Sequence, residues 1–511
     1  MPAPFYVTTP IYYPNAAPHL GTAYTTTYAD TLVRYHRLAG EDAYFITGTD
    51  EHGEKLAEAA AAQKLAPQAF VDGMAERFRA QWTALGLEPR RFVRTTDRAH
   101  VRAVQHFWQT LYDKGEIELR DYEGLYCVGC EEFKTERELA DGKCTLHPNR
   151  PIEPRRERNY FFRSSRYHDW LAAELRANPS LIEPERYRNE VLAMLRDGGV
   201  GDLCISRPVE RLSWGVPLPF DDGFVAYVWA DALITYLTAI GYPDDPDWTR
   251  AWSGSHHVIA KEILKFHGVF WPIMLHAAGL PLYRALRVHG YWTLGGQKIS
   301  KSATGLVDAL ALKDTYGFEG LRYFMLREMS FGVDAEFSEE ALVARFNADL
   351  ANDLGNLVSR SLGMLGKYFG GRVPEGSAAS DLRAIAARVA ADVDRHTRAF
   401  STRAALAALW ELVGAANKYV DSSAPWVLAK DPARKGELAT VMYELFESIR
   451  VIGCLLAAFM PETSAKILAA LGADGAQGAL AQRLDWGGLA AGTETRKLEA
   501  LFPRVEKTAE K

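Results

Sequence analysis

The opening of the chain constrains its fold more than any other part. Residues 5–13 (FYVTTPIYY) have the aromatic and β-branched composition of a buried strand, and prolines then interrupt the pattern. Apolar residues at helical spacing follow over 24–35, a second strand-like stretch covers 43–47, and residues 48–53 turn into another helical pattern. This order predicts an α/β fold of the Rossmann type, whose parallel sheet binds ligands at the carboxyl ends of its strands.

Length and composition predict several folded domains. At about 100–200 residues per domain, the 511 residues allow three or four, and a hydrophobic fraction of 48% supplies their cores. A cysteine-bearing, charged stretch indicates an insertion into the α/β domain, and an Ala/Leu-rich helical pattern indicates a helix bundle at the end of the chain. The predicted segments are the first half of the α/β domain, 1–114; the insertion, 115–227; the second half, 228–295; a connecting region, 296–345; and the bundle, 346–511.

Charge and hydropathy exclude some classes of function. With 59 Lys+Arg against 65 Asp+Glu, the net charge of −6 does not favour coating of DNA, which needs a basic surface. The longest apolar run, 451–460, is far shorter than the roughly 20 residues of a membrane-spanning helix. The N-terminus has neither a basic segment nor an apolar signal region. We therefore expect a cytoplasmic protein with no DNA and no membrane partner.

Three of the five cysteines form a cluster with metal-ligand spacing. Cys127 and Cys130 are separated by two residues, and Cys144 and His147 form a second such pair thirteen residues later. Four such ligands in two close pairs are typical of a closed, tetrahedral zinc site. We therefore predict one structural Zn²⁺ per chain, in a knuckle over 127–147. The alternative is buried, inert thiols beside a surface histidine.

Two short motifs suit phosphate chemistry. His19-Leu20-Gly21-Thr22 stands where the first strand gives way to the first helix, and the N-terminus of a helix attracts anions. Gly295-Gly296 precedes Lys298 and Lys301, and a mobile loop with two ammonium groups can close over a triphosphate. The structural alternatives are an ordinary core histidine and a solvated surface loop.

These motifs carry a resemblance to a known family. Together with 8–13 (TTPIYY), 48–53 (GTDEHG), 227–232 (YVWADA), 270–272 (FWP) and 424–426 (APW), they make the chain resemble the class I aminoacyl-tRNA synthetases. Within that class the chain resembles the methionyl-tRNA synthetases, in their bacterial form with one zinc knuckle.

The resemblance implies a function for the predicted segments. The α/β domain is then catalytic, with the zinc knuckle in its connective insertion, 296–345 contacts the tRNA stem, and 346–511 binds the anticodon. The implied enzyme is a ligase that activates L-methionine with ATP, accompanied by Mg²⁺, to methionyl-adenylate and pyrophosphate. It then transfers the methionyl group to the 3′ end of tRNA(Met), initiator and elongator.

The resemblance also assigns residues to this reaction. The implied catalytic residues are His19, Asp50, Lys298 and Lys301. The residues implied for ATP are His19, Gly21, Thr22, Lys298, Ser300 and Lys301. The residues implied for methionine are Ile11, Tyr13, Asp50, Trp229, Ala232, Leu233, Tyr236 and His289. The residues implied for the anticodon are Asn352, Asn356, Arg360, Pro425 and Trp426.

Simpler roles stay open for some of these residues. Asp50 could cap the helix that follows it, Trp229 and Tyr236 could be ordinary core, and Trp426 could anchor the bundle. The Asn352, Asn356 and Arg360 stripe could be a solvated or bundle-contact face.

The chain also departs from the family pattern, and two other readings remain. Thr22 stands where the family usually has a second histidine, which predicts weaker stabilisation of phosphate charge and slower adenylation. No further tRNA-binding domain follows residues 501–503, so we expect a monomer. One alternative is another class I synthetase, although a large editing insertion does not fit between 115 and 227. The other is a non-catalytic, tRNA- or nucleotide-binding paralogue, which Asp50 and the two loop lysines argue against.

Overall fold

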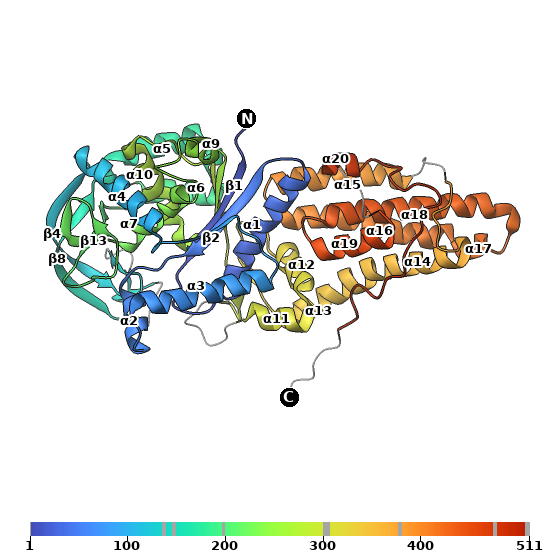
Figure 1. The fold of residues 1–511 in the computed structure, drawn as a ribbon, viewed down its shortest axis with the longest axis horizontal. Coiled ribbons are helices and arrows are strands. Elements are labelled where there is room, and N and C mark those ends of the chain that lie inside the picture. Colours follow the sequence, from blue (N-terminus) through green and yellow to red (C-terminus); the bar gives the residue numbers. More distant parts are fainter. Residues whose placement is uncertain are drawn as a thin grey trace. The chain divides into compact units, whose positions relative to one another are not determined.

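The computed structural model describes residues 2–134, 139–145, 150–196, 200–299, 307–376, 381–473 and 478–505. They form two compact units, which we describe separately. Unit 1 comprises residues 1–18 and 44–289, and unit 2 comprises residues 19–43 and 290–511 (Figure 1). The bounds of the finer segments predicted from the sequence stay predictions.

Unit 1 is built on a six-stranded sheet. The strands, in spatial order, are β3 (Arg91–Arg94), β2 (Ala43–Thr49), β1 (Phe5–Tyr12), β14 (Ser255–Ala260), β15 (Ala285–His289) and β9 (Ile182–Glu183). β1 pairs in parallel with β14, and β14 with β15. The predicted Rossmann-type parallel sheet is therefore confirmed. The strand order reverses between β1 and β14, which is where sheets of this kind bind ligands.

Helices and single turns of helix complete the α/β part of unit 1. Their buried faces form one core with the sheet, in which Trp108, Trp252 and Trp271 are fully enclosed. The helices are α2 (Glu54–Ala62), α3 (Pro67–Ala84), α4 (Arg98–Asp113), α5 (His168–Ala177), α6 (Glu185–Met194), α7 (Val228–Ala232), α8 (Thr235–Thr238), α9 (Trp248–Trp252) and α10 (Trp271–Ala278), with the π-helical turn η5 (Phe266–Phe270) and the 3₁₀ turns η2 (Ser164–Tyr167), η3 (Pro179–Leu181) and η4 (Lys261–Ile263).

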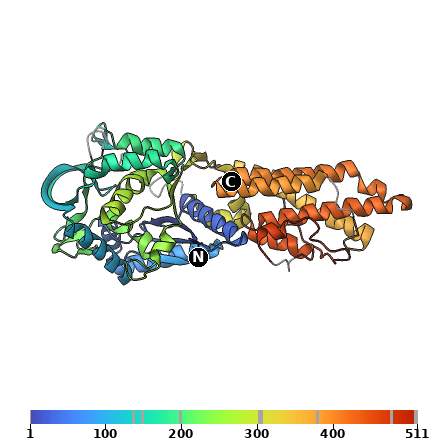
Figure 2. The ribbon, with the colours of Figure 1, turned by 90° about the horizontal axis from the view of Figure 1, so that it is seen from above.

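The predicted insertion contains short antiparallel sheets. Its longest feature is a ribbon of β4 (Ile117–Cys127) and β8 (Ile152–Phe162), which curves along one edge of unit 1 (Figures 1 and 2). The remaining strands are β5 (Glu132–Lys134), β6 (Leu139–Ala140), β7 (Lys143–Cys144), β10 (Leu203–Cys204), β11 (Ser206–Pro208), β12 (Pro217–Leu218) and β13 (Asp221–Ala226). The same segment also supplies β9, the edge strand of the large sheet.

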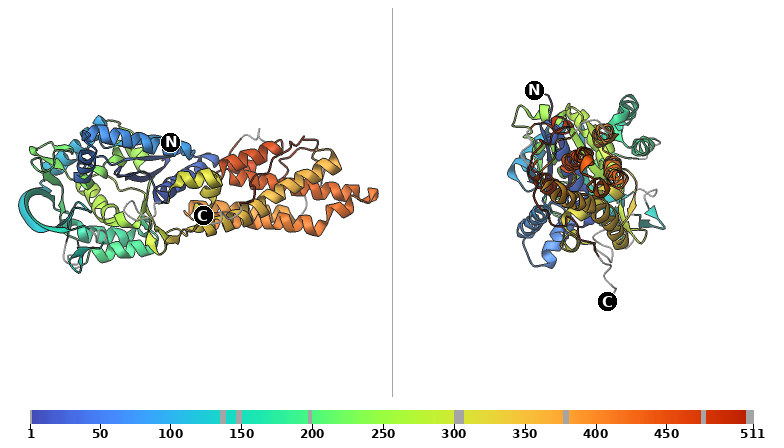
Figure 3. Two further views of the ribbon diagram at one scale, coloured as in Figure 1. Left: turned by 90° about the horizontal axis from the view of Figure 1, so that it is seen from below. Right: turned by 90° about the vertical axis from the view of Figure 1, so that its right-hand side faces the viewer.

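Unit 2 is mainly helical, as predicted for 346–511, and its long helices run side by side (Figure 3). The helices are α1 (Leu20–Leu38), α11 (Ala309–Tyr316), α12 (Phe318–Glu328), α13 (Glu339–Arg345), α14 (Asn356–Phe369), α15 (Asp381–Arg398), α16 (Thr402–Ser423), α17 (Pro425–Leu428), α18 (Lys435–Leu456), α19 (Pro461–Ala470) and α20 (Leu480–Arg483), with the π-helical segment η6 (Phe346–Gly355) and the 3₁₀ turn η7 (Pro432–Arg434). A small sheet contains β17 (Gln297–Lys298), β16 (Trp292–Leu294) and β18 (Ala335–Glu336). Within the described ranges, no helix has both the length and the hydropathy needed to cross a membrane.

Within unit 2, a buried arginine joins α1 to α12 and to the segment after α18. Arg322, on α12, is 1% exposed and forms an ion pair with Asp30 of α1 at 2.6 Å. Its guanidinium also donates to the hydroxyl of Thr31 at 2.8 Å and to the carbonyl of Phe459 at 2.7 Å. A buried charge is tolerated when it is paired in this way, so Arg322 fixes the helix that begins next to His19.

Candidate active site and metal centre

Three of the four predicted zinc ligands lie together. The sulfur atoms of Cys127, Cys130 and Cys144 are all within 4.8 Å of one another, and those of Cys130 and Cys144 are 3.5 Å apart. The fourth, His147, lies outside the described residues. Burial raises the pKa of the Cys130 thiol, so a bound cation is needed to stabilise its thiolate. The donor set fits a metal ion such as zinc.

Tight turns present these thiols. Cys127 ends β4, and the amide of Cys130 donates to its carbonyl at 3.1 Å. Cys144 ends the β6–β7 hairpin, whose two turn residues, Asp141 and Gly142, have φ of 51° and 71°. Positive φ at both positions is the type I′ geometry that favours glycine. This hairpin thus presents Cys144 beside the other two thiols.

The residue after Cys130 connects the metal turn to the predicted methionine pocket. Glu131 is 4% exposed, and the Tyr13 hydroxyl lies 3.3 Å from each of its carboxylate oxygens. The amide of Lys55 donates to the same carboxylate at 2.7 Å. Sequence reasoning did not select Glu131, because an acidic residue beside a metal ligand has no pattern that distinguishes it from a solvated one.

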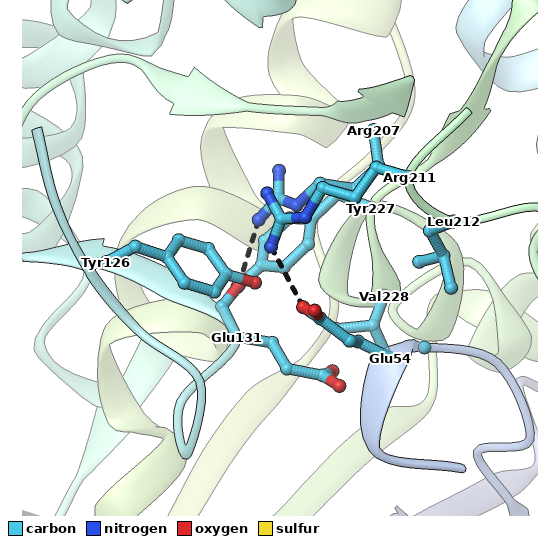
Figure 4. A pocket seen from close by; sticks show the side chains of 9 residues that line it. Glu54, Tyr126, Glu131, Arg207, Arg211, Leu212, Tyr227 and Val228 are labelled. Carbon is cyan, nitrogen blue, oxygen red and sulfur yellow. Dashed lines mark hydrogen bonds and ion pairs between the residues drawn. The ribbon is translucent and has the colours of Figure 1, made fainter. Parts of the chain in front are cut away.

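A small cavity lies beside this turn. Figure 4 shows Arg207 and Arg211 reaching across it, with Arg207 donating to the Glu131 carbonyl at 2.9 Å and Arg211 to the Glu54 carboxylate at 2.9 Å. The Arg207 guanidinium also lies over the Tyr227 ring, 4.4 Å from its centroid. Arg207 therefore joins the turn after Cys130 to Tyr227, the residue that precedes α7.

Asp50 has the most unusual environment of the predicted site residues. It is 8% exposed, and its Oδ1 has no hydrogen-bond partner among the described residues. Burial raises the pKa of Asp50 well above its ordinary value, and the negative charges of Asp231 and Glu131 raise it further. Its possible role as a helix cap is wrong, because Gly53 occupies the N-cap position of α2. A buried, unpaired carboxylate oxygen is suited to bind a cationic group of a ligand.

The two residues that follow Asp50 are held by hydrogen bonds to other parts of unit 1. Glu51 is fully buried and accepts hydrogen bonds from Arg94 at 2.7 Å and Thr49 at 2.6 Å. His52 lies 2.6 Å, through Nδ1, from the carboxylate of Asp231. The turn at 48–53 is therefore rigid, and Asp50 is the acidic residue in it whose oxygen is left for a ligand.

Two of the aromatic residues predicted for methionine, Trp229 and Tyr236, form a connected group with two residues that were not predicted. The Trp229 ring stacks on Phe266 at 4.1 Å, and the Tyr236 hydroxyl lies 2.8 Å from Nε2 of His267. The Trp229 and His267 rings meet edge to face, with centroids 6.2 Å apart, which joins the two pairs. Sequence reasoning missed His267, although it follows Phe266 in the aromatic stretch before 270–272.

The protonation of His267 follows from its contacts. Burial lowers its pKa to about 4, so the ring is neutral near pH 7. Its Nδ1 faces the carbonyl of Ile263 at 3.0 Å and must donate, because a carbonyl only accepts. Nε2 is then the acceptor, and the Tyr236 hydroxyl donates to it.

The other predicted pocket residues lie on β1, at the end of α7 and on β15. Ile11 is half-buried on β1, Ala232 and Leu233 are buried at the end of α7, and His289 is buried at the carboxyl end of β15. His289 pairs in register with Ala260 of β14. β14 separates β1 from β15 in the sheet, so Ile11 and His289 lie near the carboxyl ends of strands two positions apart.

His19 and Thr22 form a reciprocal cap on α1. The His19 amide donates to the Thr22 hydroxyl at 2.9 Å, and Nδ1 of the His19 ring accepts from the Gly21 amide at 3.1 Å. Because Nδ1 accepts, a neutral His19 ring carries its proton on Nε2. A Cβ on residue 21 would lie 3.0 Å from the ring, so Gly21 leaves room for it. The alternative of an ordinary core histidine is wrong, since His19 is a half-buried helix cap.

The glycines before the loop lysines lie in a hairpin. Gly295 and Gly296 form the tight turn between β16 and β17, with φ of 60° and 76°. Ser300 and Lys301 lie outside the described residues, as does the side chain of Lys298. Their assignment to ATP stays a prediction.

The residues predicted for the anticodon lie on η6, α14 and α17 of unit 2. Asn352 and Asn356 are exposed, and Arg360 forms an ion pair with Asp421 at 3.0 Å. Pro425 is buried, whereas the Trp426 side chain beside it is 45% exposed. The alternative that Trp426 anchors the bundle is therefore wrong.

Comparison with known families and proteins agrees along the whole chain. The model described as class I tRNA synthetases (M) matches residues 5–147 and 135–362. The model described as the anticodon-binding domain of methionyl-tRNA ligase matches residues 373–511.

Individual methionine–tRNA ligases also match this chain over nearly its whole length. Methionine–tRNA ligase of Streptomyces coelicolor is 42% identical over 98% of this chain and 97% of its own. That of Synechocystis sp. is 43% identical over 99% of this chain and 98% of its own. The structure of Mycobacterium tuberculosis methionyl-tRNA synthetase bound by methionyl-adenylate superposes with a TM-score of 0.92 at 40% identity, covering 98% of this chain and 100% of that one. The apo form of the same enzyme gives 0.87 at 38%, covering 99% of each chain.

Proposed function

Because the chain belongs to the methionyl-tRNA synthetase family, we propose how its own residues perform the reaction of that family. Its activity is that of a methionine–tRNA ligase. Methionine reacts with ATP to give methionyl-adenylate and pyrophosphate, and the methionyl group is then transferred to the 3′ end of tRNA.

The observation that carries our assignment of the amino-acid site is the unpaired oxygen of Asp50. The α-ammonium of methionine supplies the donors and the positive charge that this buried carboxylate lacks. Because Glu51 and His52 are already bound to other residues, the turn does not have to reorganise when methionine arrives. Asp50 then fixes the end of the substrate that carries the reacting carboxylate.

Methionine itself provides the nucleophile of the first step. One oxygen of its carboxylate attacks the α-phosphorus of ATP, the bond to the bridging oxygen breaks, and pyrophosphate leaves with the electron pair. No nucleophile of the enzyme is required, so catalysis consists of alignment and stabilisation of phosphate charge. We assign the phosphate contacts to Nε2–H of His19, the amides at the start of α1 near Gly21, and the loop residues Lys298, Ser300 and Lys301.

Selectivity for the side chain comes from shape and aromatic contact. A thioether is apolar and only a weak acceptor, so a pocket walled by rings and aliphatic groups suits it. We assign these walls to Ile11, Tyr13, Trp229, Ala232, Leu233, Tyr236 and His289, together with His267. Since the Tyr236 hydroxyl donates to neutral His267, its proton is not available to a polar side chain of a competing amino acid.

The metal has a structural role in this proposal. Cys127, Cys130, Cys144 and His147 would hold one zinc ion, which supplies cross-linking of the insertion and no reactive position. Mg²⁺ would enter with ATP. In unit 2, the exposed Trp426 ring and the Asn352, Asn356 and Arg360 side chains would read unstacked anticodon bases of initiator and elongator tRNA. We further propose a monomer that acts in the cytoplasm.

Calorimetric titration of the protein with methionine tests the Asp50 assignment. The wild-type chain should bind methionine, and Asp50→Asn should weaken binding by roughly 10- to 100-fold, as expected when a charged hydrogen bond is lost. Glu54→Gln, a nearby carboxylate already bound to Arg211, is the matched control and should change affinity by less than about threefold. Equal affinities of the wild type and Asp50→Asn would contradict the assignment.

A further inference from the structure

We propose that Asp231 is a positioning residue, which holds the Asp50 turn against the helix that carries Trp229 and Ala232. The inference rests on the proposed roles of Asp50 and Trp229. Asp231 is on α7, between the two pocket residues, and its side chain is fully buried. It would act on methionine only through its neighbours.

Asp231 joins two segments of unit 1 with its two oxygens. Oδ2 accepts from Nδ1 of His52 at 2.6 Å, and Oδ1 accepts from Nε2 of His100 at 2.7 Å. His52 belongs to the turn with Asp50, two residues away, whereas His100 belongs to α4. One carboxylate on α7 therefore contacts both the turn that carries Asp50 and the helix α4.

The two histidines are otherwise similar. Both are buried and both contact Asp231 at short distance, so removal of either contact leaves a buried carboxylate with half of its partners. Burial alone would raise the pKa of Asp231, but the two histidines lower it to about 2, so the carboxylate is charged at neutral pH. His100 also lies 3.1 Å from the Thr238 hydroxyl through its other nitrogen. Stability depends on both contacts, but only the His52 contact reaches the turn that carries Asp50.

The other side-chain hydrogen bonds of the 48–53 turn connect it to parts of unit 1 other than α7. The Glu51 carboxylate accepts hydrogen bonds from Arg94, the last residue of β3, and from the hydroxyl of Thr96. The Trp214 indole donates to the Glu51 carbonyl at 2.7 Å. Among the described residues, the His52–Asp231 contact is the side-chain hydrogen bond that joins this turn to α7. Loss of that bond would let Asp50 shift relative to Trp229, and small displacements of binding groups weaken binding strongly.

A crossed pair of substitutions tests the inference, because the two histidines use different nitrogens. An asparagine amide can replace Nδ1 of histidine, and a glutamine amide can replace Nε2. His52→Asn should therefore keep the contact with Asp231, and His52→Gln should lose it. At position 100 the preference is reversed, since His100→Gln keeps the contact with Asp231.

Methionine-dependent ATP–pyrophosphate exchange, which needs no tRNA, provides the readout. We expect His52→Gln to raise the KM for methionine by roughly 10-fold or more, and His52→Asn by less than about threefold, with the KM for ATP unchanged in both. His100→Asn should lower the melting temperature and leave the KM for methionine within about twofold of the wild type. Asp231→Asn, which keeps the size of the side chain, is a second variant and should raise the KM for methionine but not that for ATP.

Two results would overturn the proposal. One is an equal KM for methionine in His52→Asn and His52→Gln. The other is a rise in this KM in His100→Asn as large as in His52→Gln, which would mean that Asp231 only stabilises the fold. Failure of the proposed function itself would give other results. The wild type would then show no methionine-dependent exchange, or Asp50→Asn would leave the KM for methionine unchanged.

Discussion

Both carboxylate oxygens of Glu131 lie 3.3 Å from the Tyr13 hydroxyl, and Glu131 directly follows the candidate metal ligand Cys130. The position of the Tyr13 ring, directly after β1, therefore depends on the turn that carries two of the clustered cysteines. Since Glu131 is 4% exposed, loss of this contact would leave a buried carboxylate with one hydrogen-bond partner fewer.

Replacement of Glu131 should weaken methionine binding. Glu131→Ala removes the acceptor for Tyr13 and for the amide of Lys55, and should raise the KM for methionine in pyrophosphate exchange by roughly 10-fold. Glu131→Gln keeps one acceptor oxygen and should have a smaller effect. Glu123→Ala, an exposed carboxylate on β4, is the control. A KM in Glu131→Ala equal to that of the control would show that Tyr13 does not need this contact.

Removal of the metal should loosen the insertion. Elemental analysis should find one zinc ion per chain, and chelation should lower the melting temperature and expose Cys127, Cys130 and Cys144 to a thiol reagent, because the metal is what holds their thiolates. His147→Ala should bind zinc more weakly. A metal-free protein with an unchanged melting temperature and unreactive thiols would contradict a structural zinc site.

Methionine binding should depend on pH through Asp50. Because burial and neighbouring carboxylates raise its pKa, Asp50 takes up a proton at a higher pH than an ordinary aspartate. Only the ionised carboxylate attracts the substrate ammonium, so affinity for methionine should fall as pH decreases through this raised pKa. Calorimetric titrations with methionine over a series of pH values measure this effect. The dependence should vanish in Asp50→Asn.

The same pKa shift has a consequence for stability, of opposite sign to that of an ion-paired aspartate. The folded protein binds the Asp50 proton more tightly than the unfolded chain does, so the free energy of unfolding falls as pH rises from the ordinary aspartate value through the raised one. Asp50→Asn removes this cost and should stabilise the protein by about 1 kcal/mol at neutral pH. A destabilised Asp50→Asn variant in thermal unfolding would contradict the description of Asp50 as an unpaired buried charge.

Thr22 should matter through the cap it forms with His19. Thr22→Val keeps the shape and loses the hydroxyl, which accepts from the His19 amide and donates to the His19 carbonyl at 2.7 Å. Loss of such a cap costs about 1 kcal/mol of stability, and a less well-placed His19 should lower kcat for adenylate formation several-fold. Thr25→Val, a hydroxyl one turn further along α1, is the control. Equal kcat in the two variants would exclude a role for the cap.

Trp426 should affect tRNA and not adenylation. Because its side chain is 45% exposed, Trp426→Ala should leave the melting temperature unchanged. Loss of a stacked base is worth about 1–3 kcal/mol, so kcat/KM for tRNA should fall by roughly 10- to 100-fold while pyrophosphate exchange is unaffected. Val427, the next residue, is 48% exposed, and Val427→Ala is a matched control. A loss of exchange in Trp426→Ala would point to a structural role for this residue.

The sequence predicted the elements better than it predicted the contacts between them. The strand at 5–13, the helix after it and the strand at 43–47 correspond to β1, α1 and β2, because hydrophobic periodicity reports burial directly. The three cysteines also came together as their spacing indicated. In contrast, the roles of Glu131, Asp231 and His267 depend on residues far away in the chain, and no local pattern records such pairs.

Some residues have structural roles that their motif did not indicate. Gly295 and Gly296 looked like flexible parts of a loop, but their positive φ values belong to a hairpin turn. Thr22 looked like the loss of a phosphate contact, but its hydroxyl completes the cap on α1. A short motif gives the residue types at a site, and several geometries are compatible with each type.

ATP–pyrophosphate exchange with methionine, beside a panel of other amino acids and the Lys301→Ala variant, tests the central claim most directly. We predict exchange with methionine far above every other proteinogenic amino acid, and its loss in Lys301→Ala, because the loop lysine neutralises charge as pyrophosphate leaves. Folded, zinc-containing protein that supports no methionine-dependent exchange, or that exchanges equally with another amino acid, would contradict the account.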